Sequence, residues 1–420
     1  MDQPLDVTII GAGMITVDQL LPSLYHLQRL RQVGEIRVVS RHSGSVQALA
    51  QHPTLCQAFP GQGFPTSGAG LGADHPLAYR DVLAALPPRQ AVVVAVPDAL
   101  HYEVVMAALQ HDQHVLCVKP LFQCYAHTQE ADTLARSKGL YLGVEYHKRF
   151  DRRSLIARRH YRQGHFGEFV MGEAKLLEPY CYRHSNFQNW FTVEQADPFT
   201  YVGCHYVDLV YFITGLRPVE VSVVTVPGRF PNGNVGYLWS HARVRFENGA
   251  WLSVINGLGY PDDGSGSNDQ GMVLYCEGAG KTGMIRHDDQ FRGVTHCYVE
   301  GIGPGGTHHN FVNPDYFRYV PWEGPGLQPI GYGYDSVAGH LHAIQRVEAV
   351  AAGLSGTAAL AARQAALQEI DEQGLLATAS NSAINDLVVE AARLSIARGG
   401  SSVRIRYEPA PGVGTDVGQD

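Results

Sequence analysis

One stretch limits the possible folds of this chain more than any other, the strand–helix–strand pattern of Ala91–Pro120. Val92–Val96 is a continuous apolar and mostly β-branched run, which is typical of a strand buried on both faces. His101–Gln110 then has helical spacing, and His114–Val118 is the next strand. Strands joined through a helix lie parallel in one sheet, and open α/β sheets bind ligands at the carboxyl ends of their strands. Lys119 directly follows such an end, where chemistry is expected.

The amino terminus predicts a nucleotide-binding turn. Val7–Ile10 reads as a buried strand that leads into GAGMIT and then into a helix over about Met14–Gln32. Gly11 permits the tight turn, Gly13 lets the backbone approach a pyrophosphate, and the first N–H groups of the helix carry partial positive charge. Thr16 stands where the dinucleotide fingerprint has a third glycine, which loosens the packing of the helix on the strand without blocking phosphate. The order of elements predicts a Rossmann domain, and the expected cofactor contacts here are Gly11, Gly13, Met14 and Ile15.

The end of the second strand bears on the choice of nucleotide. Ile36–Val39 is followed by Ser40 and Arg41, where an acidic residue would favour NAD by binding the ribose 2′-hydroxyl. A hydroxyl and a guanidinium can instead clamp the 2′-phosphate of NADP. The pattern therefore leans slightly toward NADP within an NAD(P) site. The alternative, in which Arg41 is a solvated charge that stacks on adenine, stays open.

Composition bounds the rest. The chain has 420 residues, 45% hydrophobic and 17% charged, which is enough for two cores, and its net charge of −8 argues against a nucleic acid or an anionic membrane as partner. It has no apolar run of membrane-spanning length, and MDQPLDVTII lacks the order of a signal peptide, so we expect a cytoplasmic protein. The seven cysteines have no paired metal-ligand spacing, so we expect reduced thiols and no metal site.

The pattern changes near residue 150, which predicts a Rossmann domain over 1–150 and an α+β domain over 151–420. Beyond the boundary, long strands separated by Gly, Asn and Asp turns predict a large open, mostly antiparallel sheet: Glu168–Leu177, Val219–Val226, Leu238–Phe246, Ala250–Asn256, Met272–Glu277 and Thr295–Glu300. Helical periodicity is found in Asp151–Gly164, Phe199–Gly215, Val337–Leu354, Ala358–Gln373 and Ser382–Arg398. Two loops rich in glycine and aromatic residues, Gly257–Gly271 and Gly301–Tyr334, have the length of binding, lid or subunit-contact segments.

Five segments occur in a telling order: VTIIGAGMIT, AVPDALH, HVLCVKP, GVEYHKRFD and VGCHYVDLVYFITG. Together they resemble the Gfo/Idh/MocA oxidoreductases, the family named for glucose-fructose oxidoreductase and inositol dehydrogenase, over nearly the whole chain. The resemblance implies a Rossmann domain followed by an open sheet whose free face makes subunit contacts, and hence a homo-oligomer. It also implies reversible hydride transfer between a nicotinamide and a sugar or cyclitol carbinol.

The resemblance assigns the catalytic residues. Val118-Lys119-Pro120 stands where the family has Glu-Lys-Pro, so Lys119 is kept and would lie near both the nicotinamide ribose and the reacting oxygen. His205 matches the family's helix-borne histidine and is the best candidate for the general acid/base. Tyr201 replaces the family's aspartate one turn earlier, and its phenol either binds the substrate oxygen or only fills the volume. Asp208, farther along the same helix, is expected to be a structural partner.

The same resemblance extends to the cofactor. Pro97, Asp98 and His101 match the family's Thr-Pro-Asn-x-x-His turn, which borders the nicotinamide ribose. Residues 145–149 fall where the family has a Gly-Phe-Asn-Arg-Arg-like stretch beside the nicotinamide; the expected cofactor contacts are Glu145 and His147, and the expected substrate contacts are Tyr146 and Lys148. A merely polar strand exit is the alternative.

A segment dense in rings and amides, Pro179–Phe191, is the best candidate for substrate recognition. Sugars offer C–H faces that stack on rings, and their hydroxyls need directional partners. The candidate substrate contacts are Arg183, His184, Asn186, Gln188 and Trp190, together with Tyr201, Tyr332 and Tyr334. An aromatic subunit interface would use the same residue types.

Three classes of function follow. The first is an NAD(P)-dependent dehydrogenase of a sugar, cyclitol or glycoside, including 3-oxidation of a glycoside. The second is an NAD-dependent glycosidase that oxidises its substrate transiently, eliminates the aglycone, adds water and returns the hydride. The third is a non-catalytic sugar or nucleotide sensor, against which the retention of Lys119 and His205 argues.

Overall fold

The computed structural model describes residues 4–66, 74–262, 268–278, 280–288, 296–301, 307–308 and 316–414. The chain divides into two compact units. The first comprises Met1–Phe122, Ala126–Phe150 and Asp315–Ser382, and the second comprises Gln123–Tyr125, Asp151–Pro314 and Ala383–Asp420. This division differs from the expected one into 1–150 and 151–420, because a later part of the chain returns to the first unit and supplies part of its core.

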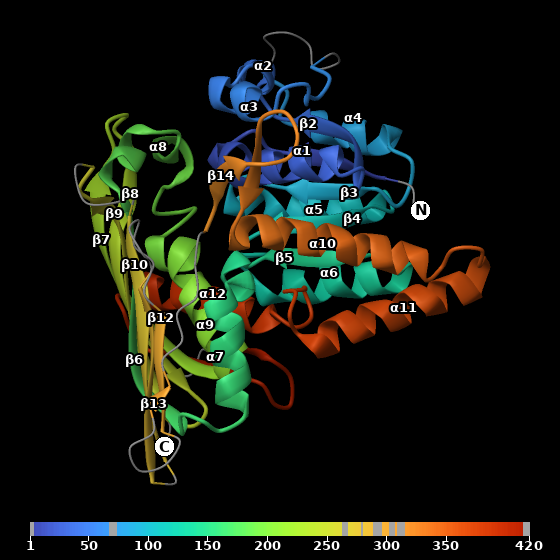
Figure 1. Ribbon diagram of the computed structural model, residues 1–420. Coiled ribbons are helices and arrows are strands. Elements are labelled where there is room, and N and C mark those ends of the chain that lie inside the picture. Colours follow the sequence, from blue (N-terminus) through green and yellow to red (C-terminus); the bar gives the residue numbers. More distant parts are fainter. Residues whose placement is uncertain are drawn as a thin grey trace. The chain divides into compact units, whose positions relative to one another are not determined.

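The first unit is built on a five-stranded parallel sheet in the order β2-β1-β3-β4-β5, as expected for a Rossmann domain (Figure 1). Its strands are β1 (Leu5–Ile10), β2 (Val33–Val39), β3 (Ala91–Val94), β4 (His114–Val118) and β5 (Leu142–Glu145). The order reverses between β1 and β3, which makes this the switch point at which such sheets bind nucleotides. At the other edge Val118 of β4 is in register with Glu145 of β5, so the chain leaves both strands at the same level.

Helices cover this sheet. After β1 a π-helical turn, η1 (Thr16–Leu20), continues into α1 (Leu21–Arg29), and the next helices are α2 (Ser43–Ala50), α3 (Pro53–Ala58), α4 (Ala78–Ala85), α5 (His101–Gln110) and α6 (Tyr125–Lys138). Short 3₁₀ turns, η2 (Asp98–Leu100) and η3 (His147–Phe150), follow β3 and β5. The returning segment adds the hairpin β14 (Arg318–Pro321) and β15 (Leu327–Ile330), then α10 (Tyr332–Ala349) and α11 (Gly356–Gln373). Val337, Leu341, Ile344 and Val347 of α10 belong to the same buried core as Val7 and Leu24.

The second unit contains a ten-stranded sheet in the order β13-β12-β11-β10-β6-β9-β8-β7-β16-β17. Its strands are β6 (Glu168–Pro179), β7 (Pro218–Arg229), β8 (Val235–Phe246), β9 (Trp251–Tyr260), β10 (Asp269–Gly278), β11 (Lys281–Asp288), β12 (His296–Gly301), β13 (Thr307–His308), β16 (Val403–Arg406) and β17 (Gly412–Val413). The described pairings are antiparallel except for the parallel pair β6–β9, so the mostly antiparallel sheet is confirmed. Sequence reasoning missed β11, β13, β16 and β17, which are short or rich in charge.

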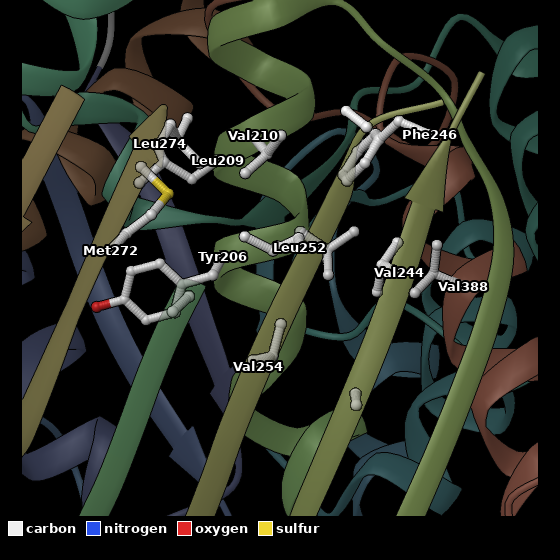
Figure 2. Close-up of a cluster of buried hydrophobic side chains, with 14 of the residues drawn as sticks. Tyr206, Leu209, Val210, Val244, Phe246, Leu252, Val254, Met272, Leu274 and Val388 are labelled. Carbon is white, nitrogen blue, oxygen red and sulfur yellow. The ribbon is translucent and has the colours of Figure 1, made fainter. Parts of the chain in front are cut away.

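One face of this sheet is covered by helices. They are α7 (Arg152–Arg162), α9 (Cys204–Thr214) with the π-helical turn η5 (Phe199–Gly203) before it, and α12 (Ala383–Ala397). Figure 2 shows Tyr206, Leu209 and Val210 of α9 among buried side chains of the strands. The other face leaves large apolar side chains exposed: Met171, Val224, Val226, Ile255 and Tyr275.

Two further expectations concern loops and membranes. Gly257–Gly271 holds the end of β9 and the start of β10, and Gly301–Tyr334 holds the β14–β15 hairpin, while the middle of each lies partly outside the described residues; their binding or lid role stays a prediction. Among the helices that the structure describes, none is long and apolar enough to cross a membrane. The described part of the chain also holds no cluster of three or more His, Cys, Asp or Glu residues that would suit a metal ion.

Candidate active site

The turn after β1 has the geometry that its glycines predict. Gly11 has a φ of +118°, and a Cβ built on it would lie 2.0 Å from the carbonyl oxygen of Ala95. Its N–H donates to the carbonyl of Val39 at 2.8 Å. Gly11 is therefore required by the close approach of three strand ends.

Gly13 differs from Gly11. A Cβ built on it would meet no heavy atom of the described residues within 4 Å beyond its neighbours in the chain. The space beside it lies at the start of a helix, where the first N–H groups have no acceptor within the helix and Met14 is exposed. Thr16 is buried, and its hydroxyl donates to the carbonyl of Gly11 at 2.8 Å, which closes the turn where the third glycine is missing. These residues fit a nucleotide pyrophosphate.

Ser40 and Arg41 lie at the end of β2, as predicted, but Arg41 has a partner that the sequence did not reveal. Its Nε and Nη2 donate to the two carboxylate oxygens of Asp74 at 2.5 and 2.6 Å. Both side chains are about half exposed, and the pairing holds the pKa of Asp74 below its ordinary value. A 2′-phosphate would compete with this carboxylate for the guanidinium.

The segment that follows β3 is bonded to the turn that follows β4. Pro97 precedes η2, Asp98 is buried, and His101 begins α5 with its ring fully buried. The Nδ1 of His101 lies 2.8 Å from the carbonyl oxygen of Pro120, and Nε2 lies 2.9 Å from that of Val96. His101 therefore contributes by fixing the turn that carries Lys119, whose peptide bond to Pro120 is cis.

The end of β5 carries a buried polar network. The Nε2 of Gln19 donates to Oε1 of Glu145 at 3.0 Å and to the carbonyl of Gly333 at 3.1 Å. The hydroxyl of Tyr316 donates to Oε1 of Gln19 at 2.5 Å, and Nδ1 of His147 lies 2.8 Å from Oε2 of Glu145. Burial alone would raise the pKa of Glu145, but His147, the hydroxyl of Ser336 and His340 together outweigh it, so the pKa lies below its ordinary value.

Some of the neighbouring predicted residues contact this network, and others are buried in the interior. The ring of His147 stacks on Tyr332 with centroids 5.7 Å apart. Tyr334 packs on His26, with ring centroids 5.5 Å apart. Tyr146 and Lys148 each expose 2% of their surface, which favours packing over contact with a substrate, and their assignment as substrate contacts stays a prediction.

In the second unit His205 and Tyr201 lie on the π-to-α helix, as predicted from their motif. His205 is buried near the start of α9. The ring of Tyr201 is packed among Phe187, Trp190 and Phe191, with centroids 5.4 to 5.6 Å away. Asp208 is buried and accepts a hydrogen bond from Asn385 at 2.7 Å, which agrees with a structural partner.

Most polar groups of the ring-rich segment 179–191 are bonded within the second unit. Arg183 donates to the carbonyl of Leu258 and lies over the ring of Tyr180, which also contacts His184. Asn186 accepts a hydrogen bond from Asn189 at 2.8 Å. The side-chain oxygen of Gln188 accepts from the N–H of Asn232 at 3.0 Å in the β7–β8 turn. The predicted substrate contacts thus hold the segment 179–191 in its conformation, and their part in substrate binding stays a prediction.

Comparison with known proteins agrees with this architecture. Residues 5–146 match the oxidoreductase family with the NAD-binding Rossmann fold, and residues 155–280 match the GFO/IDH/MocA C-terminal domain. The chain belongs to the Gfo/Idh/MocA oxidoreductase family. The resemblance found in its motifs is therefore confirmed.

Named relatives of this Gfo/Idh/MocA chain include sugar dehydrogenases. It is 27% identical over 222 residues to D-glucoside 3-dehydrogenase of Escherichia coli K12, covering 52% of this chain and 56% of that one. It is 27% identical over 186 residues to an uncharacterised oxidoreductase of Schizosaccharomyces pombe, so the chain spans only 45% of that relative's length and 44% of its own is covered. Levoglucosan dehydrogenase, in complex with NADH and L-sorbose, has a similar fold, with a TM-score of 0.64, 18% identity and coverage of 96% and 99% of the two chains.

Sequence reasoning missed several residues of the candidate site. Gln19 and Tyr316 complete the network at Glu145, and Asp74 holds Arg41. Gln19 carried a weak signal, since an amide inside an otherwise apolar helix face is expected to have a buried partner. No spacing rule would have found Asp74 or Tyr316, because each comes from a distant loop.

Proposed function

We propose that this chain is an NAD(P)-dependent dehydrogenase that acts on a ring hydroxyl, or the corresponding ketone, of a sugar, cyclitol or glycoside. The observation that carries the proposal is the open Gly13 turn in the same sheet as Lys119. The Gly13 turn follows β1 and Lys119 follows β4, so both lie at the carboxyl ends of parallel strands of one sheet. The names of the relatives, a glucoside 3-dehydrogenase and a levoglucosan dehydrogenase, support a glucose-like ring as the substrate.

Each assigned residue has a separate role in the proposed reaction. A nicotinamide, when bound, supplies the hydride acceptor or donor. The turn of Gly11 and Gly13 and the first N–H groups of the helix hold the pyrophosphate. Lys119, steadied through His101 and the carbonyl of Pro120, polarises the reacting oxygen with its ammonium group. His205 takes the carbinol proton in oxidation and returns it in reduction.

A second candidate is a glycosidase that uses the same oxidation transiently. The observation that favours it is Tyr201, which stands where the family has an acidic residue. The ring of Tyr201 is packed against Phe187 and offers no carboxylate beside His205, which is a departure from the family's dehydrogenase pattern. Oxidation at C3 would acidify the C2 proton, after which the aglycone leaves, water adds and the hydride returns. The net reaction would then be hydrolysis without a net change of cofactor.

One assay separates these functions from a sensor without activity. The protein is incubated with NAD or NADP and a panel of methyl glucosides, levoglucosan and myo-inositol, while absorbance and released alcohol are followed. Net NAD(P)H formation supports the dehydrogenase, released alcohol with constant absorbance supports the glycosidase, and ligand binding alone supports the sensor. Mass spectrometry of nucleotide released from the purified protein identifies the cofactor independently.

Substitutions test the assigned residues. Lys119→Ala and His205→Ala should each lower turnover by at least about a hundredfold, the usual scale for a positioned acid/base or electrostatic group, with nucleotide affinity largely kept. Turnover near that of the wild type in His205→Ala would reject its assignment. Tyr201→Phe removes only a hydroxyl, so unchanged kinetics would assign Tyr201 to packing.

We further propose a homo-oligomer formed through the open face of the ten-stranded sheet. Met171, Val224, Val226, Ile255 and Tyr275 expose between 45% and 58% of their surface there. Several large apolar side chains exposed on one sheet face are typical of a protein contact. A second copy of the chain is the occupant that the family resemblance implies.

A further inference from the structure

We propose that Asp74 supplies the carboxylate that binds the 2′-hydroxyl of the adenosine ribose, so that this chain prefers NAD to NADP. The inference rests on the proposed dehydrogenase function and names the nucleotide of that same site. The end of β2 offers Ser40 and Arg41 where NAD sites have an acid, and the chain has no acidic residue between Glu35 and Asp74. The missing acid therefore comes from a point 33 residues beyond Arg41.

The end of β2 is bonded to the nucleotide turn. Val39, the last residue of β2, is in register with Ile10 of β1, and its carbonyl accepts the N–H of Gly11 at 2.8 Å. Arg41 follows Val39 by two residues. In sheets of this type the turn after the first strand holds the pyrophosphate, and the end of the second strand reaches the adenosine ribose. A group fixed to Arg41 therefore lies at the ribose end of the nucleotide site.

Asp74 is fixed to this point through its backbone and through its side chain. The backbone of Asp74 pairs with that of His42 in an antiparallel bridge, and the N–H of His75 donates to the carbonyl of Arg41 at 2.9 Å. Nε and Nη2 of Arg41 donate to the two carboxylate oxygens of Asp74 at 2.5 and 2.6 Å. A bidentate pair of this kind sets the direction of the carboxylate as well as its distance.

The ion pair leaves acceptor capacity on the carboxylate. An ionised carboxylate has about four acceptor sites on its two oxygens, and the bidentate arginine takes two of them. The side chain of Asp74 is 48% exposed, so a ligand can reach it from solvent. The hydrogen bonds from Arg41 also lower the pKa of Asp74, which keeps the acid ionised. Asp74 can therefore accept the hydrogen bond of a ribose hydroxyl while it stays bonded to Arg41.

The same ion pair disfavours a 2′-phosphate. Arg41 and Asp74 together carry no net charge, which suits an uncharged hydroxyl better than a phosphate dianion. To bind through the two bonded nitrogens of Arg41, the phosphate would have to displace the carboxylate, and the backbone bridge would keep the displaced negative charge close to it. Another titratable group beside the pair is His42, whose Nδ1 lies 3.8 Å from Oδ1 of Asp74. Arg41 thus becomes a phosphate ligand once the charge of Asp74 is removed.

A purely structural role of Asp74 makes a different prediction. The ion pair could serve only to fasten the residues before α4 to the end of β2. Loss of Asp74 would then change the affinities for NAD and for its analogue with 2′-deoxyadenosine by the same factor. A contact with the 2′-hydroxyl requires instead that the two nucleotides differ in the wild type and become equal without the carboxylate.

The experiment is calorimetric titration of the full chain, stripped of copurified nucleotide, with NAD, NADP and 2′-deoxyadenosine NAD at pH 8, where ordinary imidazoles are neutral. The wild type should bind NAD at least about tenfold more tightly than either of the others, the scale of a lost hydrogen bond to a charged group. Asp74→Ala should bind NAD and the deoxy analogue equally. The matched control is Asp81→Ala on α4, which removes an acid that is 81% exposed and 3.9 Å from His75; it should keep the wild-type ratios.

Two results with the wild type alone would overturn the inference while the proposed function stands. They are binding of NADP as tight as that of NAD, and equal affinities for NAD and the deoxy analogue. Persistence of the wild-type difference between these two in Asp74→Ala would assign the hydroxyl to another group, and so would overturn the inference as well. If the wild type binds none of the three nucleotides, the proposed function fails and the role of Asp74 fails with it.

Discussion

Gly11 and Gly13 are two residues apart, yet alanine at each should have opposite consequences. At Gly11 the backbone has a φ of +118°, which an alanine adopts only under strain of about 1–3 kcal/mol. Its Cβ would also lie 2.0 Å from the carbonyl oxygen of Ala95, so the end of β3 has to move, and overpacking of this kind costs about 1–3 kcal/mol more. We therefore expect Gly11→Ala to lower the free energy of unfolding by roughly 2–6 kcal/mol, a large part of what holds a domain folded.

Gly13→Ala is the matched control for stability. Its Cβ would meet no described heavy atom within 4 Å beyond the chain neighbours, so the free energy of unfolding should stay within about 0.5 kcal/mol of the wild-type value. The added methyl group would occupy the space that we assign to the pyrophosphate. The affinity for NAD or NADP should therefore fall at least about tenfold, or about 1.4 kcal/mol.

Urea unfolding and calorimetric titration of nucleotide measure the two effects on the same samples. The expected pattern is loss of stability in Gly11→Ala and loss of affinity alone in Gly13→Ala. Unchanged nucleotide affinity in Gly13→Ala would refute the placement of the pyrophosphate. Wild-type stability in Gly11→Ala would refute the packing argument at the strand ends.

Three other predictions concern selectivity, pH and assembly. Asp74→Asn should raise the affinity for NADP relative to NAD, because it frees Arg41 and removes a negative charge, and Arg41→Ala should do the reverse. Calorimetry measures the two dissociation constants, and an unchanged ratio between them would reject the phosphate clamp. Burial lowers the pKa of His340 from 6.5 to about 4, so between these pH values the unfolded chain binds a proton that the folded chain does not. The contribution of His340 to the free energy of unfolding is complete above about pH 6.5 and should fall by at most about 3 kcal/mol toward pH 4. In urea titrations at each pH, His340→Gln should flatten this fall. Val226→Asp should dissociate the proposed oligomer in light scattering and Val350→Asp, at another exposed valine, should not; equal masses for both variants would exclude the sheet face as the interface.

The parallel sheet could be predicted because its strands are buried on both faces. Such strands are continuous apolar runs, and their ends are marked by polar residues, so His101–Gln110 and His114–Val118 have the bounds in the structure that the sequence indicates. The return of the chain to the first unit could not be predicted. The periodicity of Val337–Leu354 indicates a helix, but which core receives its apolar face depends on contacts more than three hundred residues away, such as that of Gln19 with Gly333.

The candidate site shows the same limit. Residues that belong to a motif, such as Gly11, Lys119 and His205, can be placed from spacing because the motif and its secondary structure coincide. Partners that arrive from other loops cannot. Arg41 looked like a free phosphate ligand, and only the fold shows that Asp74 already holds it. Ion pairs between loops have no regular spacing in the sequence, so a sequence pattern cannot predict them.

The interrupted course of the first unit has a consequence for how this protein is made. Four of the apolar side chains that α10 adds to its core, Val337, Leu341, Ile344 and Val347, are each worth about 1.5–3 kcal/mol on burial and are translated only after most of the second unit. A ribosome that has synthesised residues 1–150 has therefore released a nucleotide-binding sheet with part of its core still missing. Such an intermediate exposes apolar surface for as long as the next two hundred or so residues take to appear, which at about 5–20 residues per second is on the order of ten seconds or more. Chaperone capture, or early binding of the nucleotide itself, would matter most during that interval.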